Sequence, residues 1–218
     1  MIFQDRKDAG QKLATKLTRY ANRDDVIVLA LPRGGVPVAY EVAKQLNAPL
    51  DIFLVRKLGV PGHEELAMGA IASGGVTFVN QEIVDYLRIP KAMIEVVAEH
   101  EQIELERRDR AYRGDRPPPE VKDRTVILID DGLATGSTMR AAAESLRLQK
   151  PKRLVVAVPV SSPETCEAFR SEVDEIVCAA TPAHFRGVGL WYKDFSQTLD
   201  EEVRELMRRA TKHQQHAA

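Results

Sequence analysis

A short stretch in the second half of the chain combines two carboxylates with a loop rich in hydroxyl groups and glycine. It reads Val126-Ile-Leu-Ile-Asp-Asp-Gly-Leu-Ala-Thr-Gly-Ser-Thr138. Its apolar residues predict a buried strand that ends at Asp130 and Asp131, and a helix is expected to follow. Free N–H groups at a helix start, with their partial positive charge, suit a phosphate group. We assign to this phosphate loop Ala134, Thr135, Gly136, Ser137 and Thr138.

The two acids need a different partner, because a carboxylate repels a phosphate. Sugar hydroxyls and Mg²⁺ are groups that carboxylates bind in such a site. The plainer explanation is that the acids only end a strand and a threonine only caps a helix, but it leaves the combination of acids and loop unexplained. A P-loop or a dinucleotide-binding loop would need glycine patterns that the chain lacks. We therefore expect Asp130 and Asp131 to face sugar hydroxyls, a magnesium ion or both.

Two further groups of residues stand where other strands are expected to end. The first group is Arg33 with the glycine pair Gly34-Gly35, and the second is the adjacent cations Arg56 and Lys57. Guanidinium, ammonium and exposed N–H groups bind pyrophosphate, although a glycine turn or a solvated strand exit would explain either group alone. Carboxyl ends of parallel strands meet at one edge of a sheet. The predicted pyrophosphate-binding residues are therefore Arg33, Gly34, Gly35, Arg56 and Lys57, with Lys57 also assigned a catalytic role.

Buried strands and the helices between them must position these groups. Runs rich in β-branched residues predict strands at Val26–Leu31, Asp51–Val55, Val126–Ile129 and Leu154–Val158, with a weaker run at Glu175–Ala179. Helical patterns cover Val38–Leu46, Ser137–Leu148 and Glu164–Ser171. Continuous apolar strands are typical of parallel sheets that are covered on both faces. The alternation predicts an α/β fold with an open, mostly parallel sheet flanked by helices.

The region 59–124 breaks this alternation and predicts an inserted subdomain. Two apolar runs flank Gly74-Gly75 and indicate a hairpin. Two helices follow, over Gln81–Tyr86 and about Lys91–Tyr112. Opposite charges at helical spacing, such as Glu104 and Arg108, predict a solvated helix face. A lid or a subunit contact is the alternative for this charged helix.

Composition narrows the class of protein. The 218 residues are 44% hydrophobic and 29% charged, as in globular domains, and the formal net charge of -1 offers no basic excess for nucleic acid. Cys166 and Cys178 have no metal-binding spacing, and two buried free thiols are expected rather than a disulfide. Without an apolar leader or a run of membrane-spanning length, we expect a cytoplasmic protein that does not bind membranes.

The segment Val126–Thr138 resembles the donor-binding signature of type I phosphoribosyltransferases. Residues from about Phe3 to Glu202 also resemble a bacterial group usually labelled only as predicted phosphoribosyltransferases. That wider resemblance rests on Arg33-Gly-Gly-Val-Pro37, Glu65-Leu-Ala-Met-Gly-Ala-Ile71, the donor signature and Asp194-Phe195. It implies a single domain over residues 1–218 that binds phosphoribosyl pyrophosphate with Mg²⁺. It also implies that Asp130 and Asp131 are catalytic by orienting the ribose, with Asp130 also a candidate metal ligand.

The resemblance also implies features outside the donor signature. It implies a strained or cis peptide in the Arg33 loop, a flexible loop over Gly59–His63, and a homodimer. It further implies an acceptor-binding hood at residues 181–197, where the aromatic faces are Phe185, Trp191 and Tyr192. Those aromatics could equally be packing residues. Asp194 is a second candidate metal ligand, unless it caps the last helix.

The implied reaction transfers a 5-phosphoribosyl group to a nitrogen of a small base-like acceptor and releases pyrophosphate. Ala134 stands where enzymes acting on 6-oxopurines often carry an aspartate, which argues against that acceptor class and leaves the acceptor open. The alternative is a non-catalytic regulator on the same fold that senses phosphoribosyl pyrophosphate or a nucleotide.

Overall fold

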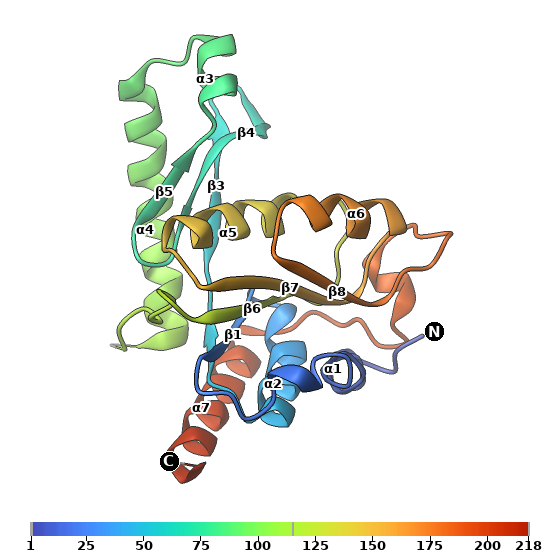
Figure 1. Ribbon diagram of the computed structural model, residues 1–218. Helices are drawn as coiled ribbons and strands as arrows, with labels where there is room; N and C mark the ends of the chain where they lie inside the picture. Colours follow the sequence, from blue (N-terminus) through green and yellow to red (C-terminus); the bar gives the residue numbers. More distant parts are fainter. Residues whose placement is uncertain (1, 115, 218) are drawn as a thin grey trace.

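The computed structural model describes residues 2–114 and 116–217, which form two separate sheets (Figure 1). The larger sheet has five parallel strands in the order β2-β1-β6-β7-β8. Its strands are β1 (Val26–Ala30), β2 (Leu50–Ile52), β6 (Thr125–Ile129), β7 (Arg153–Val160) and β8 (Glu175–Ala180). The predicted open parallel sheet is confirmed.

Helices cover both faces of this sheet. On one face lie α1 (Arg6–Ala14), α2 (Gly35–Leu46) and α7 (Asp200–Ala217), and on the other lie α5 (Ser137–Leu148) and α6 (Pro163–Ala168) (Figure 1). Three 3₁₀ turns span Thr18–Tyr20, Phe169–Ser171 and Val188–Trp191. Sequence pattern did not predict α1, which begins where the Asp5 side chain accepts the N–H of Asp8. Among the described residues, no helix is both long and apolar enough to cross a membrane.

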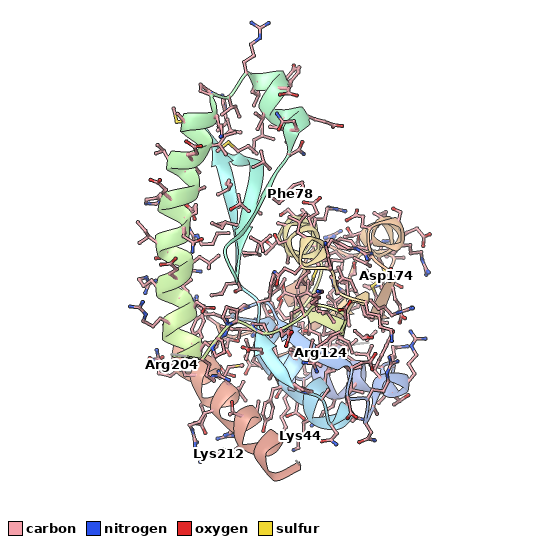
Figure 2. The ribbon with its side chains drawn as sticks, turned by 60° about the vertical axis from the view of Figure 1, so that its left-hand side comes forward. Lys44, Phe78, Arg124, Asp174, Arg204 and Lys212 are labelled. Carbon is pink, nitrogen blue, oxygen red and sulfur yellow. A yellow bond between two sulfur atoms is a disulfide. The ribbon has the colours of Figure 1, made fainter. Side chains whose placement is uncertain are left out.

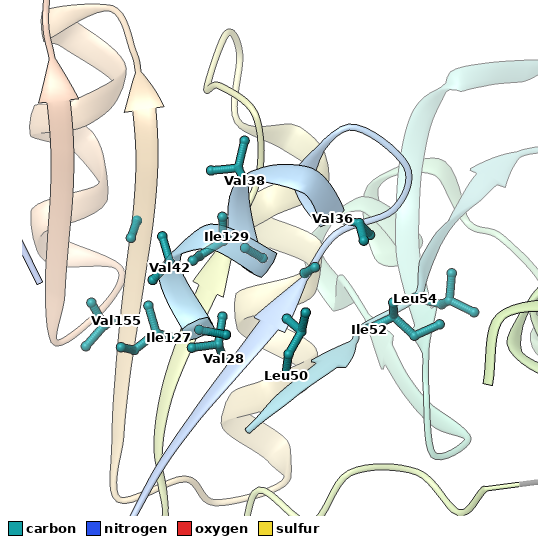
Figure 3. Packing of buried hydrophobic residues seen from close by; sticks show 14 of the residues in the cluster. Val28, Val36, Val38, Val42, Leu50, Ile52, Leu54, Ile127, Ile129 and Val155 are labelled. Carbon is teal, nitrogen blue, oxygen red and sulfur yellow. The ribbon is translucent and has the colours of Figure 1, made fainter. Parts of the chain in front are cut away.

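The core explains why the strands read as continuous apolar runs. Val28, Ile127 and Val155 point from three neighbouring strands towards Val38 and Val42 of α2 (Figure 3). The alternate residues of the same strands pack on the other side against α5. Because each face is covered by helices, successive side chains are buried on opposite sides, and no polar alternation appears.

The chain reverses its direction of winding between β1 and β6, which are neighbours in the middle of the sheet. From β1 it runs through α2 to β2 on one side, and from β6 it runs through α5 to β7 on the other. The two strands are paired in register up to Ala30 and Ile129. Ligands of open α/β sheets bind outside the carboxyl ends of strands at such a switch point.

The second sheet belongs to an arm that stands away from the core (Figure 2). It contains antiparallel strands β3 (Val55–Val60), β4 (His63–Ala72) and β5 (Val76–Val79), followed by α3 (Gln81–Leu87) and α4 (Lys91–Arg113). Gly74 and Gly75 have φ of 88° and 75°, in the left-handed region that favours glycine, and they lie in the three-residue turn between the paired residues Ala72 and Val76. The hairpin and both helices are confirmed, as is the pair of Arg108 Nε with Glu104 Oε1 at 2.8 Å.

One expectation about the chain entering the arm is wrong. The run Asp51–Val55 is not one strand, because β2 ends at Ile52 and β3 begins at Val55 after a buried junction. The pairing of β3 with β4, which local pattern does not reveal, accounts for the difference. Within the expected flexible loop Gly59–His63, Val60 pairs with His63 across a tight turn, and the flexibility of this loop stays a prediction.

The two cysteines were expected to be free thiols, and the structure corrects this. Cys166 on α6 and Cys178 on β8 form a disulfide, with their Cα atoms 6.8 Å apart. They are only 12 positions apart, and α6 folds back beside β8, which explains why they meet.

Candidate functional site

The loops after β1 and β6 pack directly against each other at the switch point. A Cβ on Gly34 would lie 2.0 Å from Asp131 Oδ2, and one on Gly35 would lie 2.7 Å from the carbonyl oxygen of Ile129. No side chain fits at either distance, so these glycines permit a close approach of backbone to the acids. Their residue types predicted only pyrophosphate binding, and this packing role adds to that assignment.

The Arg33 loop carries the backbone feature that the resemblance implied. The Pro32–Arg33 peptide is cis. The Arg33 guanidinium is partly exposed, and its Nη1 lies 3.7 Å from Oδ1 of Asp200 at the start of α7. The Tyr112 hydroxyl donates to the same carboxylate oxygen at 2.6 Å. Arg33 thus borders the site while making a long ion pair with the terminal helix.

The acid pair is half-buried at the carboxyl end of β6. Asp130 Oδ1 accepts the N–H of Asp131 at 2.8 Å. Burial, together with the neighbouring Asp131 charge, raises the pKa of Asp130 well above its usual 3.8. Burial also raises the pKa of Asp131, although the nearby Arg6 guanidinium opposes this shift. Such a pair favours a cation or hydroxyl donors as ligands.

Arg6 of α1 reaches this pair, although it was not among the predicted site residues. Its Nε and Nη2 lie 2.9 and 2.8 Å from Asp131 Oδ2. Its Nη1 donates to the carbonyl oxygen of Ser196 at 2.6 Å, and its guanidinium carbon lies 4.1 Å from the centre of the Phe195 ring. No local signal could have found it, because Arg6 stands in a charged stretch that resembles any exposed helix start.

The phosphate loop is oriented by hydrogen bonds to its carbonyl groups. The Ala134 carbonyl accepts from Thr165 Oγ1 of α6, and the Thr135 carbonyl accepts from Arg140 Nη1 of α5, both at 2.8 Å. In a planar trans peptide the N–H points opposite to the C=O. The N–H groups of Thr135 and Gly136 therefore point away from these partners, towards the open side of the loop.

Arg140 is itself fixed by several contacts. Its Nε lies 2.9 Å from both carboxylate oxygens of Glu172, and its guanidinium carbon lies 4.9 Å from the centre of the Phe169 ring. Gly136, with φ of 76°, also packs on Phe169. Arg140 was not among the predicted site residues, although its place one helical turn after Gly136 could have suggested a contact with the loop. The predicted hydroxyl side chains remain exposed, namely those of Thr135, Ser137 and Thr138.

The two cations of the Arg56-Lys57 pair have different surroundings. Both lie on β3 rather than at the end of a core strand. Lys57 Nζ lies 3.4 Å from Ser137 Oγ and lines a cavity of about 280 Å³ between the arm and α5. Arg56 pairs with Glu101 of α4. Successive residues of a strand point to opposite faces, so Lys57 meets the phosphate loop while Arg56 is directed to the arm.

The hood aromatics are mainly packing residues. Tyr192 is buried between Phe3 and Phe195, with ring centres 5.4 and 5.0 Å away, and its hydroxyl donates to the Asp131 carbonyl. These neighbours favour a packing role for Tyr192, and its predicted stacking on an acceptor stays a prediction. Phe185 and Trp191 are half-buried against the same cluster. Their predicted role as acceptor-binding residues stays a prediction.

The candidate metal ligands are not grouped into a preformed site. No cluster of three His, Cys, Asp or Glu residues that could hold a metal occurs within residues 2–114 and 116–217. Asp194 Oδ1 accepts the N–H of Ser196 at 2.9 Å, which makes it a turn cap. It does not cap α7, which begins at Asp200. Asp130 is the carboxylate whose burial beside Asp131 best suits a cation.

Comparisons with known proteins agree with this geometry. A family model described as "Phosphoribosyl transferase domain" matches residues 2–67 and 62–190. "Putative phosphoribosyl transferase Rv0571c" of Mycobacterium tuberculosis (strain ATCC 25618 / H37Rv) is 44% identical over 209 residues, which cover 96% of this chain and 47% of that protein. The chain therefore spans about half the length of such curated relatives.

A second relative and a solved structure extend the comparison. "Bifunctional protein PyrR" of Alkaliphilus metalliredigens (strain QYMF) is 32% identical over 124 residues, which cover 56% of this chain and 62% of that protein. The crystal structure of TT1426 from Thermus thermophilus is 40% identical, has a TM-score of 0.86, and covers 96% of this chain and 99% of its own. Because the family model matches well over half of the residues, the chain belongs to the phosphoribosyl transferase domain family.

Proposed function

We propose that this chain transfers the 5-phosphoribosyl group of phosphoribosyl pyrophosphate to a nitrogen atom of a base-like acceptor and releases pyrophosphate. One observation carries the proposal beyond family membership: the close packing of Gly34 against Asp131. This packing brings the Arg33 loop, the acid pair and the phosphate loop to one end of the sheet. A donor with a phosphate, a ribose and a pyrophosphate has one group for each of these three features.

Each part of the site then has a distinct task. The loop from Ala134 to Thr138 binds the 5-phosphate through backbone N–H groups and hydroxyls. Asp130 and Asp131 bind the ribose hydroxyls and stabilise positive charge that grows on the ribose as its bond to pyrophosphate breaks. Arg33 and Lys57 stabilise the leaving pyrophosphate, and the acceptor nitrogen supplies the electron pair for the new bond. The protein mainly positions the reactants and offsets charge.

A magnesium ion fits this scheme through Asp130. The raised pKa of Asp130, caused by burial and by Asp131, means that a bound cation would favour the ionised carboxylate. Mg²⁺ commonly takes most of its ligands from substrate phosphates and water, so a preformed cluster is not required. When bound, it would neutralise charge on the pyrophosphate.

The acceptor is the least defined part of the proposal. Ala134 offers no carboxylate to act as the general base that the resemblance associates with 6-oxopurines, so we propose an acceptor outside that class. Phe185 and Trp191 are the aromatic residues retained as candidate contacts. Both are half-buried, so only part of each ring is open to an acceptor.

Pyrophosphate release is the direct test. The protein would be mixed with phosphoribosyl pyrophosphate, Mg²⁺ and each of a panel of nitrogenous bases, with an Asp131→Asn variant as the inactive control. We expect release that depends on one base class and is lost in the variant. Tight binding of the donor without release against any base would contradict the enzyme proposal.

A second candidate function is a sensor that binds the donor or a nucleotide without turnover. It is favoured by the ion pairs of two predicted pyrophosphate cations, Arg33 with Asp200 and Arg56 with Glu101. Cations held by carboxylates are less able to stabilise a leaving group. The same release assay separates the two functions, because a sensor binds the donor and releases no pyrophosphate.

A further inference from the structure

We infer that Arg6 is a positioning residue that holds Asp131 in the orientation needed to bind the ribose of the donor. The inference rests on the proposed function and adds a residue from the N-terminal helix to the site. Arg6 is not part of the donor signature, and 125 positions separate it from Asp131.

The contacts of Arg6 restrain the carboxylate closely. Both Nε and Nη2 of Arg6 lie within hydrogen-bond distance of one oxygen, Asp131 Oδ2. Both contacts of Arg6 fall on Oδ2, so the other oxygen, Oδ1, is the one that can accept from a ligand hydroxyl. Holding one oxygen with two N–H groups fixes the rotation of the carboxylate and therefore the direction of the other oxygen.

Arg6 is in turn held by the hood. Its third contact, to the Ser196 carbonyl, and its stacking on Phe195 fix the plane of the guanidinium. The side chains of Arg6 and Asp131 are only 12% and 15% exposed, so water competes weakly for their ion pair. Burial and the ring contact leave the guanidinium little freedom to turn away.

A purely structural role would be to attach the N-terminal segment to the hood, but other groups already do this. Backbone hydrogen bonds join Phe3 to Trp191 and Lys193, and Gln4 to Asp194, at 2.8 to 2.9 Å. The Phe3 ring is fully buried in the hood cluster. The segment is therefore anchored without Arg6, and the distinctive contact of Arg6 is the one with Asp131.

Inorganic phosphate and ribose 5-phosphate can separate the role of Arg6 from that of the phosphate loop. Inorganic phosphate is expected to contact only the loop, whereas the ribose of ribose 5-phosphate is expected to contact the acid pair as well. Binding of both to the full chain would be measured by calorimetric titration, for wild type and for Arg6→Gln. We expect the variant to reduce the advantage of ribose 5-phosphate over phosphate about tenfold, as for a lost hydrogen bond to a charged group, with phosphate binding unchanged.

Two further variants make the result specific. Lys7→Gln removes one positive charge from an exposed neighbour on the same helix and should leave both affinities unchanged. Arg6→Lys keeps the charge but not the paired N–H groups, so it should recover only part of the lost advantage. Thermal melting of each variant reports whether the fold is intact.

The outcomes distinguish the inference from the function on which it rests. If Arg6→Gln keeps the full ribose advantage, or weakens phosphate binding equally, Arg6 does not position Asp131 and the inference is overturned. If wild-type protein shows no advantage of ribose 5-phosphate over phosphate, the proposed function fails, and the inference fails with it.

Discussion

The two ends of the segment from Asp130 to Thr138 are stabilised in opposite ways. The acid end is half-buried, and the cation that pairs with it comes from 125 positions away. The loop end is exposed, and its carbonyl groups are bound by Thr165, 31 positions away, and by Arg140, 5 positions away. A buried charge needs a counter-charge wherever the fold can supply one, whereas a loop that presents N–H groups needs only local partners.

The two ends are therefore expected to affect the stability of the folded state differently. Burying two adjacent carboxylates disfavours the folded state when both are ionised. Hydrogen-bonded carbonyls in the loop carry no such cost. The acid end should therefore trade stability for function, while the loop end should contribute to both, and four sets of variants test this contrast.

Asp131→Asn should have the largest effect on activity. The amide keeps the shape of the side chain but removes the charge that stabilises the ribose, so kcat/KM should fall about 100- to 1,000-fold. Stability should fall far less than activity, because the amide oxygen can still accept from Arg6 and the repulsion with Asp130 is removed. Asp24→Asn, at an exposed carboxylate, is the matched control. Turnover within twofold of wild type would remove Asp131 from the assigned role.

Gly34→Ala should damage both ends of the site through packing. Its Cβ would lie 2.0 Å from Asp131 Oδ2, so either the loop or the carboxylate must move. We expect a loss of about 1–3 kcal/mol in unfolding free energy, as for other overpacked sites, together with weaker donor binding. Gly187→Ala is the control, because nothing lies within 4 Å of a Cβ there. Equal melting temperatures for the two variants would contradict the close approach.

Arg140→Met tests the loop end alone. Without the guanidinium, the Thr135 carbonyl loses its partner and the loop loosens, so the KM for the donor should rise about tenfold with a smaller change in kcat. Arg147→Met is the control on the same helix. Arg147 Nη1 lies 2.9 Å from Asp174 Oδ2, and this ion pair does not involve the loop. Steady-state kinetics of both variants decide the matter, and equal KM values would argue against the loop contact.

Asp130→Asn should have the smallest effect on stability and the most informative pH dependence. Burial raises the pKa of Asp130 well above 3.8, so ionisation at neutral pH destabilises the folded wild type. The variant should gain about 1 kcal/mol at neutral pH. This gain should shrink as the pH falls through the raised pKa towards 3.8, because wild-type Asp130 then becomes neutral too. Urea unfolding in metal-free buffer measures this difference in unfolding free energy. A gain that does not vary with pH would contradict its assignment to the ionisation of Asp130.

Much of the fold was accessible to pattern reasoning because the relevant signals are local. The apolar run at Val126–Ile129, the turn glycines at Gly74-Gly75 and the helical periodicity of Ser137–Leu148 each reflect backbone geometry within a few residues. The predictions failed where partners are distant in sequence. The run from Asp51 to Val55 was predicted as one strand because the pairing of β3 with β4 is not visible in it.

The candidate site divides along the same line. The residue types from Asp130 to Thr138 alone pointed to a phosphate beside a hydroxylated group, since each type has a chemistry of its own. Side-chain directions came from three-dimensional packing, which turned Lys57 to the phosphate loop, Arg56 to Glu101 and Tyr192 into the hood core. Arg6 is the extreme case. A helix start rich in charges predicts a solvated arginine, and only the docking of that helix against α2 and β7 brings it within reach of the half-buried Asp131 carboxylate.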